Sequence, residues 1–348
     1  MKHSIIPTSF LALLWLILGL GACTNPSTPS APITEAPEPI KIAIPEFNKD
    51  SAYQFVQQQV DFGPRVPETK QHKACADWIR AKFDQWGWAT QFQEAVVNGF
   101  DANPLYIKNI IATINPEHDE RILLCAHWDT RRMADQDIER KDEPILGADD
   151  GGSGVGILME IARIVQQHPI DLGIDIVLFD AEDQGDSGDA VNNRQTWCIG
   201  SQHWSRQPHE MNVLPRFGIL LDMVGSMSPK FYKEGVSLNR AAPIVNMVWK
   251  EAIELGYNNL FVDEASTDVI DDHLFINDIA GIKTIDIINR DTIWDRNGNP
   301  IRDQQGRLAG RFGHHWHTHH DNMTIINPHT LHAVGNVLLH VLYKNAAE

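Results

Sequence analysis

Two kinds of apolar pattern alternate along most of the chain. Short continuous or alternating apolar runs are typical of strands, whereas apolar residues three and four positions apart are typical of helices that bury one face. Strands are predicted at residues 89–97, 107–114, 121–126, 174–179, 217–224 and 283–288. Helices are predicted at residues 51–60, 68–86, 155–167, 197–205, 242–255, 271–279 and 328–343. This alternation predicts an α/β fold with a mostly parallel, mixed and twisted sheet that helices cover on both faces.

Local signals indicate where some of these elements begin and turn. Ser51 is expected to cap the first helix, and Asp271 is expected to cap the helix at 271–279. The dipeptide Asn297-Gly298 predicts a hairpin with a type I′ turn within residues 292–302, because both residues tolerate positive φ angles. Residues 303–313 are polar and rich in glycine, so they are expected to form a loop.

The first residues resemble a targeting segment. Lys2 precedes an apolar run at residues 10–20. Two small residues, Gly21 and Ala22, separate this run from Cys23. This pattern predicts a lipoprotein signal peptide at residues 1–22, export, and a lipid anchor at Cys23 that holds the protein on the bacterial cell envelope. An ordinary signal peptide with an incidental cysteine is the alternative. Six prolines in residues 23–48 predict a disordered tether, which leaves residues 49–348 for a single folded domain.

The net charge of the chain limits the kinds of partner that it can bind. The formal net charge is −17, which argues against binding to nucleic acid or a polybasic contact with a membrane. An acidic surface instead suits cationic ligands such as peptide amino termini.

The cysteine count limits the disulfides. Apart from Cys23, the chain has Cys75, Cys125 and Cys198, so at most one internal disulfide is possible.

Acidic and histidine side chains gather where predicted strands end. Glu182 and Asp183 follow the strand at 174–179, and Asp222 lies in the strand at 217–224. The carboxyl ends of strands in an open α/β sheet line the ligand crevice, so these groups are expected to face substrate. Other candidates are His127 with Asp129, Asp149 with Asp150, and His317. This mixture of carboxylate and imidazole suits zinc. No single pair is specific, and the acidic stretch at 180–183, taken alone, is more typical of a solvated turn.

Two further segments allow more than one interpretation. The glycine-rich turn at 147–154 lacks the lysine of a phosphate loop. We instead expect its flexible glycines to let a carboxylate approach a metal. The alternative is that Asp149 is only the N-cap of the helix that follows. Residues 314–320 contain five histidines. These form either a loose tract that scavenges metal or an ordered loop in which one imidazole binds metal and Trp316 forms a wall.

From about residue 51 to its end, the chain resembles the zinc aminopeptidase superfamily, and within it the bacterial glutaminyl-peptide cyclotransferases, or glutaminyl cyclases. The matching motifs, in chain order, are Phe62-Gly63-Pro64-Arg65, Ala126-His127-Trp128-Asp129, Gly147-Ala148-Asp149-Asp150 with Gly152-Ser153-Gly154, Phe179-Asp180-Ala181-Glu182-Asp183, Leu220-Leu221-Asp222-Met223-Val224-Gly225, Asp271-Asp272-His273 and Trp316-His317-Thr318. The resemblance implies a zinc-aminopeptidase-like fold and makes residues 49–348 a zinc-dependent catalytic domain.

The resemblance also implies roles for single residues. Asp150, Asp183 and His317 match the zinc ligands, and Glu182 matches the general acid/base. Asp222 and Asp271 match groups that hydrogen-bond the base and the reacting amine, and Trp316 matches an aromatic wall of the substrate pocket. In two-zinc aminopeptidases, His127 and Asp222 would bind a second ion. A second pocket tryptophan of the cyclases has no clear counterpart in residues 184–194, and Trp128 is a candidate replacement.

The implied activity is conversion of amino-terminal glutaminyl residues of peptides and proteins to pyroglutamate, with release of ammonia and with one zinc ion. A two-zinc aminopeptidase that hydrolyses amino-terminal residues is the rival enzyme. An inactive surface lipoprotein that binds peptides or metal is the rival from another class.

Overall fold

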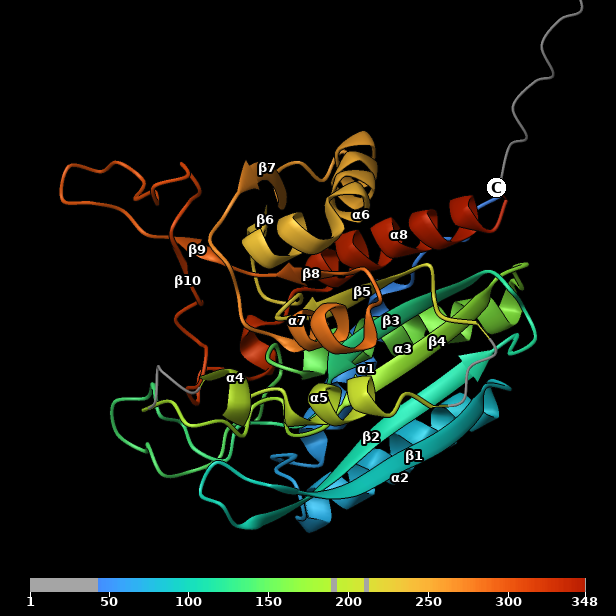
Figure 1. Ribbon diagram of the computed structural model, residues 1–348, viewed down its shortest axis with the longest axis horizontal. Helices are drawn as coiled ribbons and strands as arrows, with labels where there is room; N and C mark the ends of the chain where they lie inside the picture. The colour runs from blue at the N-terminus through green and yellow to red at the C-terminus, as the bar shows by residue number, and fades with distance from the viewer. Residues whose placement is uncertain (1–42, 189–192, 210–212, 348) are drawn as a thin grey trace, which may run out of the picture. The chain divides into compact units, whose positions relative to one another are not determined.

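The computed structural model describes residues 43–188, 193–209 and 213–347, and these residues form a central six-stranded sheet (Figure 1). The sheet order is β1-β2-β4-β3-β5-β8. Strands β4, β3, β5 and β8 are parallel, whereas β2 and β1 are antiparallel neighbours at one edge. The strands span Ala89–Asn98 (β1), Pro104–Ile114 (β2), Arg121–His127 (β3), Gly173–Phe179 (β4), Phe217–Asp222 (β5) and Thr284–Ile288 (β8). The predicted mostly parallel, mixed sheet is confirmed.

Helices cover both faces of this sheet because side chains alternate along each strand. Ile122 and Leu124 of β3 point into the larger core, and Leu123 and Cys125 point into the opposite one. Helices of the larger core are α1 (Lys49–Asp61), α2 (Lys70–Gln85), α3 (Gly152–Gln167), α6 (Gly235–Glu254) and α8 (Pro328–Asn345). The opposite core is covered by α5 (Ile199–Arg206) and a π-helical turn, η1 (Ile276–Ala280), which continues α7 (Asp272–Phe275).

Several short elements complete the described part of the chain. The parallel pair β6 (Phe231–Lys233) and β7 (Phe261–Ala265) lies outside the main sheet, and neither strand was predicted. The antiparallel pair β9 (Asp291–Thr292) and β10 (Gly310–Arg311) carries a long projecting loop (Figure 1). Helix α4 (Asn193–Thr196) and the 3₁₀ turn η2 (Met323–Ile325) are single turns.

The starts of two helices differ from prediction. Helix α1 is capped by Asn48, whose side chain accepts hydrogen bonds from two backbone N–H groups, so the prediction that Ser51 is the cap is wrong. The preceding Phe47 is 1% exposed, so the core includes residues before the helix. Helix α6 begins at Gly235 rather than at residue 242, because Glu234 caps it and the chain continues through a kink at Ala241. The kink precedes Pro243, which explains why the apolar pattern suggested a later start.

The hairpin within residues 292–302 forms, but its turn is not of type I′. Gly298 has a φ of 80°, whereas Asn297 is not among the residues with positive φ, as a type I′ turn would require. The side chain of Asp295 instead fixes the turn by accepting hydrogen bonds from the N–H groups of Asn297 and Asn299. The predicted loop at 303–313 is wrong only at Gly310–Arg311, where β10 pairs with β9.

The terminal predictions fall mainly on undescribed residues. The proposed signal peptide at 1–22 and most of the tether at 23–48 lie outside the described residues. Within the described ranges, no helix has the length and apolar character needed to span a membrane. Cys75, Cys125 and Cys198 are buried and free of disulfides.

Candidate functional site

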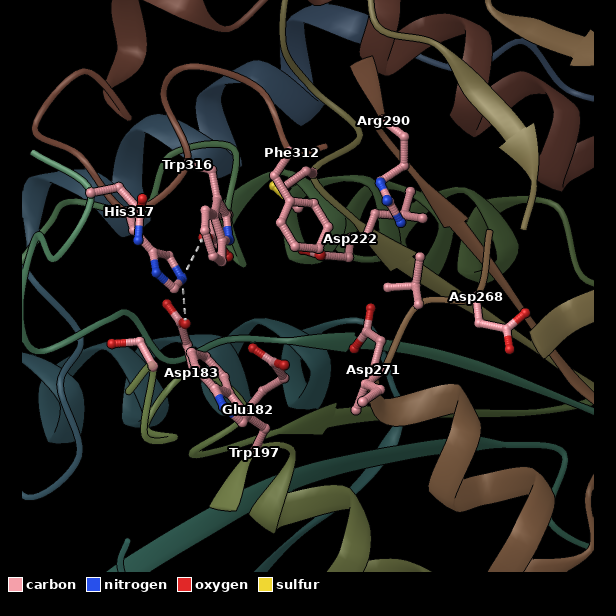
Figure 2. A pocket seen from close by; sticks show the side chains of 17 residues that line it. Glu182, Asp183, Trp197, Asp222, Asp268, Asp271, Arg290, Phe312, Trp316 and His317 are labelled. Carbon is pink, nitrogen blue, oxygen red and sulfur yellow. Dashed lines mark ion pairs between the residues drawn. The ribbon is translucent and has the colours of Figure 1, made fainter. Parts of the chain in front are cut away.

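The predicted site residues meet at the carboxyl ends of the parallel strands. His127 ends β3, Asp222 ends β5, and Glu182 and Asp183 follow β4 by a few residues. They contribute to, or lie beside, a cavity of about 380 Å³ (Figure 2). Described residues that line the cavity include Asp150, Glu182, Asp183, Trp197, Asp222, Asp268, Asp271, Arg290, Phe312, Trp316 and His317. Seven of the eight predicted site residues are therefore in its wall, and His127 lies directly behind Asp150 and Asp222.

Asp150, Asp183 and His317 form one compact group of metal-binding side chains. Nε2 of His317 lies 2.8 Å from Oδ1 of Asp183 and 3.9 Å from Oδ2 of Asp150. Nevertheless, His317 Nε2, Asp150 Oδ2 and Asp183 Oδ2 are buried without a hydrogen-bond partner in the described part of the chain. One nitrogen and two carboxylate oxygens that face one another without partners fit a zinc ion.

The charges around His317 also favour a cation. Burial would lower the pKa of His317, but Asp183 and Asp135 outweigh burial and raise it to about 9. Either a proton or a metal ion must therefore offset the carboxylates. Asp135 accepts a hydrogen bond from Nδ1 of His317 at 2.9 Å, which leaves Nε2 free to face Asp183. A carboxylate behind a histidine in this way fixes the orientation of a metal ligand. Asp135 was not predicted from the sequence.

His127, Asp150 and Asp222 form a second compact group. Nε2 of His127 lies 3.0 Å from Oδ1 of Asp150 and 3.2 Å from Oδ1 of Asp222, with which it makes a hydrogen bond. The facing atoms of this group therefore satisfy one another, unlike those around His317. Burial raises the pKa of Asp222 to about 8, despite the opposing effect of His127.

Glu182 lines the cavity with its Oε2 3.9 Å from Nδ1 of His127, and its protonation is strongly perturbed. Burial raises its pKa well above the ordinary value; His127 opposes this effect and Asp271 adds to it. Oε1 of Glu182 accepts a hydrogen bond from the thiol of Cys198 at 3.3 Å. Ligand atoms of Glu182, Cys198 and Asp271 all lie within 4.8 Å of one another. A carboxyl group that holds its proton more tightly than usual, beside a second carboxylate, is suited to take up and return a proton during a reaction.

The backbone beside these groups is held by carboxylates and adopts unusual angles. Asp129 accepts hydrogen bonds from the N–H groups of Glu182 and Asp183. Among the non-glycine residues with left-handed backbone angles in the described part of the chain, four lie beside these groups: Ala181 at φ 53°, Cys198 at φ 57°, Met223 at φ 48° and His317 at φ 56°. Because Ala181 precedes Glu182 and Met223 follows Asp222, part of the chain's backbone strain lies next to the polar groups of the cavity.

Two tryptophans enclose the imidazole of His317. The Trp316 ring stacks on it with centroids 3.7 Å apart, and the Trp197 ring lies nearly parallel at 5.8 Å (Figure 2). Trp197 is a second tryptophan in the wall of the cavity; it lies just beyond residues 184–194, between α4 and α5. Trp128 does not replace it, because Trp128 is fully buried and stacks on His72.

The structure also decides between alternatives for the remaining candidates. Asp149 is not the cap of α3, because Gly151 occupies that position and Asp149 accepts a hydrogen bond from the N–H of Gly225. The histidine-rich segment is ordered: His315 lies 2.9 Å from Asp149, and His319 lies 2.7 Å from Asp137. His273 pairs with Glu234, away from the His317 group.

Comparison with known proteins identifies the family. The model of peptidase family M28 matches residues 109–342. The chain belongs to peptidase family M28. This M28 protein is 46% identical to Bacteroides thetaiotaomicron glutaminyl cyclase, with a TM-score of 0.78 over 86% of this chain and 99% of that one. It is 43% identical to a Zn-dependent exopeptidase from Parabacteroides distasonis, with the same TM-score and the same coverage.

A curated relative, a glutaminyl-peptide cyclotransferase of Drosophila melanogaster, is 24% identical over 49% of this chain and 47% of its own length. The chain thus spans about half the length of the curated relatives it matches first. Zinc is the metal that this M28 protein uses, as both the donor set and the Zn-dependent neighbour indicate.

Proposed function

We propose that this M28 protein is a glutaminyl-peptide cyclotransferase, which converts amino-terminal glutaminyl residues of peptides to pyroglutamate and ammonia. Its similarity to glutaminyl cyclases supports this proposal. The observation that carries it is the contrast between the two metal-binding groups. Ligand atoms without partners gather around His317, whereas His127 and Asp222 hydrogen-bond each other, which favours a single zinc ion.

Asp150, Asp183 and His317 would hold the zinc. When bound there, the ion supplies Lewis acidity that polarises the side-chain amide of the substrate glutamine. The indole rings of Trp316 and Trp197 keep the imidazole in one orientation and exclude water from it.

The reaction is intramolecular, so the protein mainly holds a folded substrate and moves protons. The α-amine attacks the side-chain amide carbon; a C–N bond forms to close the ring, and the bond to the amide nitrogen breaks. Glu182 would accept a proton from the amine and return it to the departing nitrogen, which leaves as ammonia. Asp271 and Asp222 would accept hydrogen bonds from the amine and hold Glu182 in place.

A two-zinc aminopeptidase remains the second candidate, because His127, Asp150 and Asp222 are close enough to hold another ion and one neighbour is an exopeptidase. In that enzyme, Glu182 would activate a water molecule for hydrolysis. The number of zinc ions bound per chain separates the two: one favours the cyclase and two the peptidase.

The deciding experiment measures two products from a Gln-initiated peptide, ammonia and free glutamine, with and without a chelator. We expect ammonia without free glutamine, and loss of the activity when zinc is removed. Release of free glutamine would favour the peptidase. Metal uptake without either product would favour a peptide- or metal-binding surface protein.

We also propose that the protein is exported and anchored through a lipid on Cys23. The supporting observation is the sequence that precedes this cysteine. Expression of the full chain in a bacterium tests this: Cys23→Ser should move the protein from the membrane fraction to the soluble fraction. Continued membrane association of that variant would contradict it.

A further inference from the structure

Arg290 follows β8 and is the only arginine or lysine among the described residues that line the cavity. It is 7% exposed. Its guanidinium group points toward the space beside Asp222 and Asp271, on the side of the cavity away from His317 (Figure 2). The cavity therefore has a metal-binding end, a carboxylate centre and a cationic end.

The hydrogen bonds of Arg290 are incomplete. Nη2 donates to the carbonyl of Gly310, and Cζ lies 5.1 Å from the centre of the Phe312 ring. Nε is buried without an acceptor, and Arg290 has no ion pair with a carboxylate in the described part of the chain. Nη1 also makes no hydrogen bond in the described part of the chain and, unlike Nε, is not enclosed, so an acceptor in the cavity can reach this charged donor and gain affinity from it.

The proposed reaction fixes where the substrate would offer such an acceptor. The side-chain amide of the glutamine lies toward Asp150, Asp183 and His317, and its α-amine lies near Glu182 and Asp271. The remaining substituent of the α-carbon is the main-chain carbonyl, which must then point away from the His317 end. Arg290 lies on that side (Figure 2).

We propose that Arg290 donates a hydrogen bond to the main-chain carbonyl oxygen of the glutaminyl residue and so anchors the peptide in the cavity. This inference rests on the proposed cyclase function and adds a substrate-binding residue to it. Because every residue in a peptide carries this oxygen, the contact anchors the peptide without selecting the residue that follows the glutamine.

A neutral oxygen fits the cavity better than an acidic side chain of the substrate. Six carboxylates line the same cavity, and they would repel a substrate anion. They are Asp150, Glu182, Asp183, Asp222, Asp268 and Asp271. The carboxylates repel a carbonyl oxygen only weakly, because it carries no net charge. It nevertheless accepts a strong hydrogen bond from a charged donor.

The test compares two substrates that cyclise with loss of ammonia but differ in this oxygen. Glutamine α-methylamide has the carbonyl, whereas 4-aminopentanamide of matching configuration has a methyl group in place of the whole methylamide group. Arg290→Met should lower kcat/KM for the methylamide by about 10- to 100-fold, the effect of losing one hydrogen bond to a charged group. It should lower kcat/KM for 4-aminopentanamide by less than about threefold, because no contact with that substrate is lost.

Two further variants keep the test decisive. Arg290→Lys retains a charged donor and should show a smaller loss, again confined to the methylamide. Arg302→Met is the matched control, since Arg302 pairs with Glu264 on the surface; it should leave both substrates unaffected. Equal losses on the two substrates, or no loss on either, would overturn the inference. A wild-type protein that releases no ammonia from glutaminyl peptides would instead refute the cyclase function itself.

Discussion

Replacing Glu182 with Gln tests the proposed proton transfer most directly. The exchange keeps the shape of the side chain, and the amide oxygen can still accept the hydrogen bond from the Cys198 thiol. It removes only the ability to take up and return a proton. The three proposed zinc ligands are unchanged, so the variant should bind zinc like the wild type.

General acid–base catalysis contributes about 10²- to 10⁴-fold to the rate of a reaction, equal to about 3–5 kcal/mol of the barrier. We expect Glu182→Gln to lose activity within or beyond this range, because Glu182 is the group to which the proposed mechanism assigns both proton transfers. Ammonia release from a glutaminyl peptide gives the rate, and elemental analysis gives the zinc content. Activity within about threefold of the wild type, with zinc retained, would refute the role of Glu182.

The pH dependence provides an independent check on the same residue. Because the pKa of Glu182 is raised, its base form accumulates only as the pH rises through that pKa, and kcat/KM of the wild type should rise with it. The stability contribution of the same group has the opposite sign. The stabilisation that protonated Glu182 gives the folded protein is complete below the pKa of an unfolded glutamate, about 4.3. It is lost as the pH rises through the raised pKa of Glu182 in the folded protein. Metal-free Glu182→Gln should therefore be at least as stable as the wild type at neutral pH.

Other positions give further tests. Asp135→Asn should weaken zinc binding by about 10- to 100-fold in competition with a chromogenic chelator, since Asp135 orients His317; unchanged affinity would contradict this. Cys198→Ala should lower kcat/KM by about 2- to 10-fold with zinc retained, and Cys198→Ser should restore most of it, if the thiol orients Glu182. Glu234→Gln removes the partner of buried His273 and should lower the free energy of unfolding by about 3 kcal/mol. Burial lowers the pKa of His273, but Glu234 outweighs burial and raises it, so urea denaturation should show the largest loss below about pH 6.5 and less as the pH rises through the raised pKa.

The strands and the polar groups at their ends were predictable because both leave strong local patterns. The apolar runs that became β3, β4 and β5 are buried at every position, so each stands out from its surroundings. The polar residues that follow them had to lie at one edge of the sheet once the strands were parallel.

What the sequence did not reveal depends on contacts between distant segments. Asp135 and His317 are 182 residues apart, and no local pattern marks the aspartate as a partner. Trp197 was placed at the start of a helix, whereas in the structure the chain is non-helical there and the ring reaches His317. Strand β6 has three residues, too few for an alternating pattern to be recognised.

The left-handed angles of Ala181, Met223 and His317 affect how this protein can change under selection for heat resistance. Each such residue costs roughly 1 kcal/mol, so the three together consume a sizeable part of the roughly 5–15 kcal/mol that keeps an ordinary domain folded. Glycine would relieve the cost at Ala181 or Met223, but it would also loosen the chain beside Glu182 or Asp222. Substitutions at these backbone positions that raise the thermal stability of the protein are therefore expected to lower its catalytic rate.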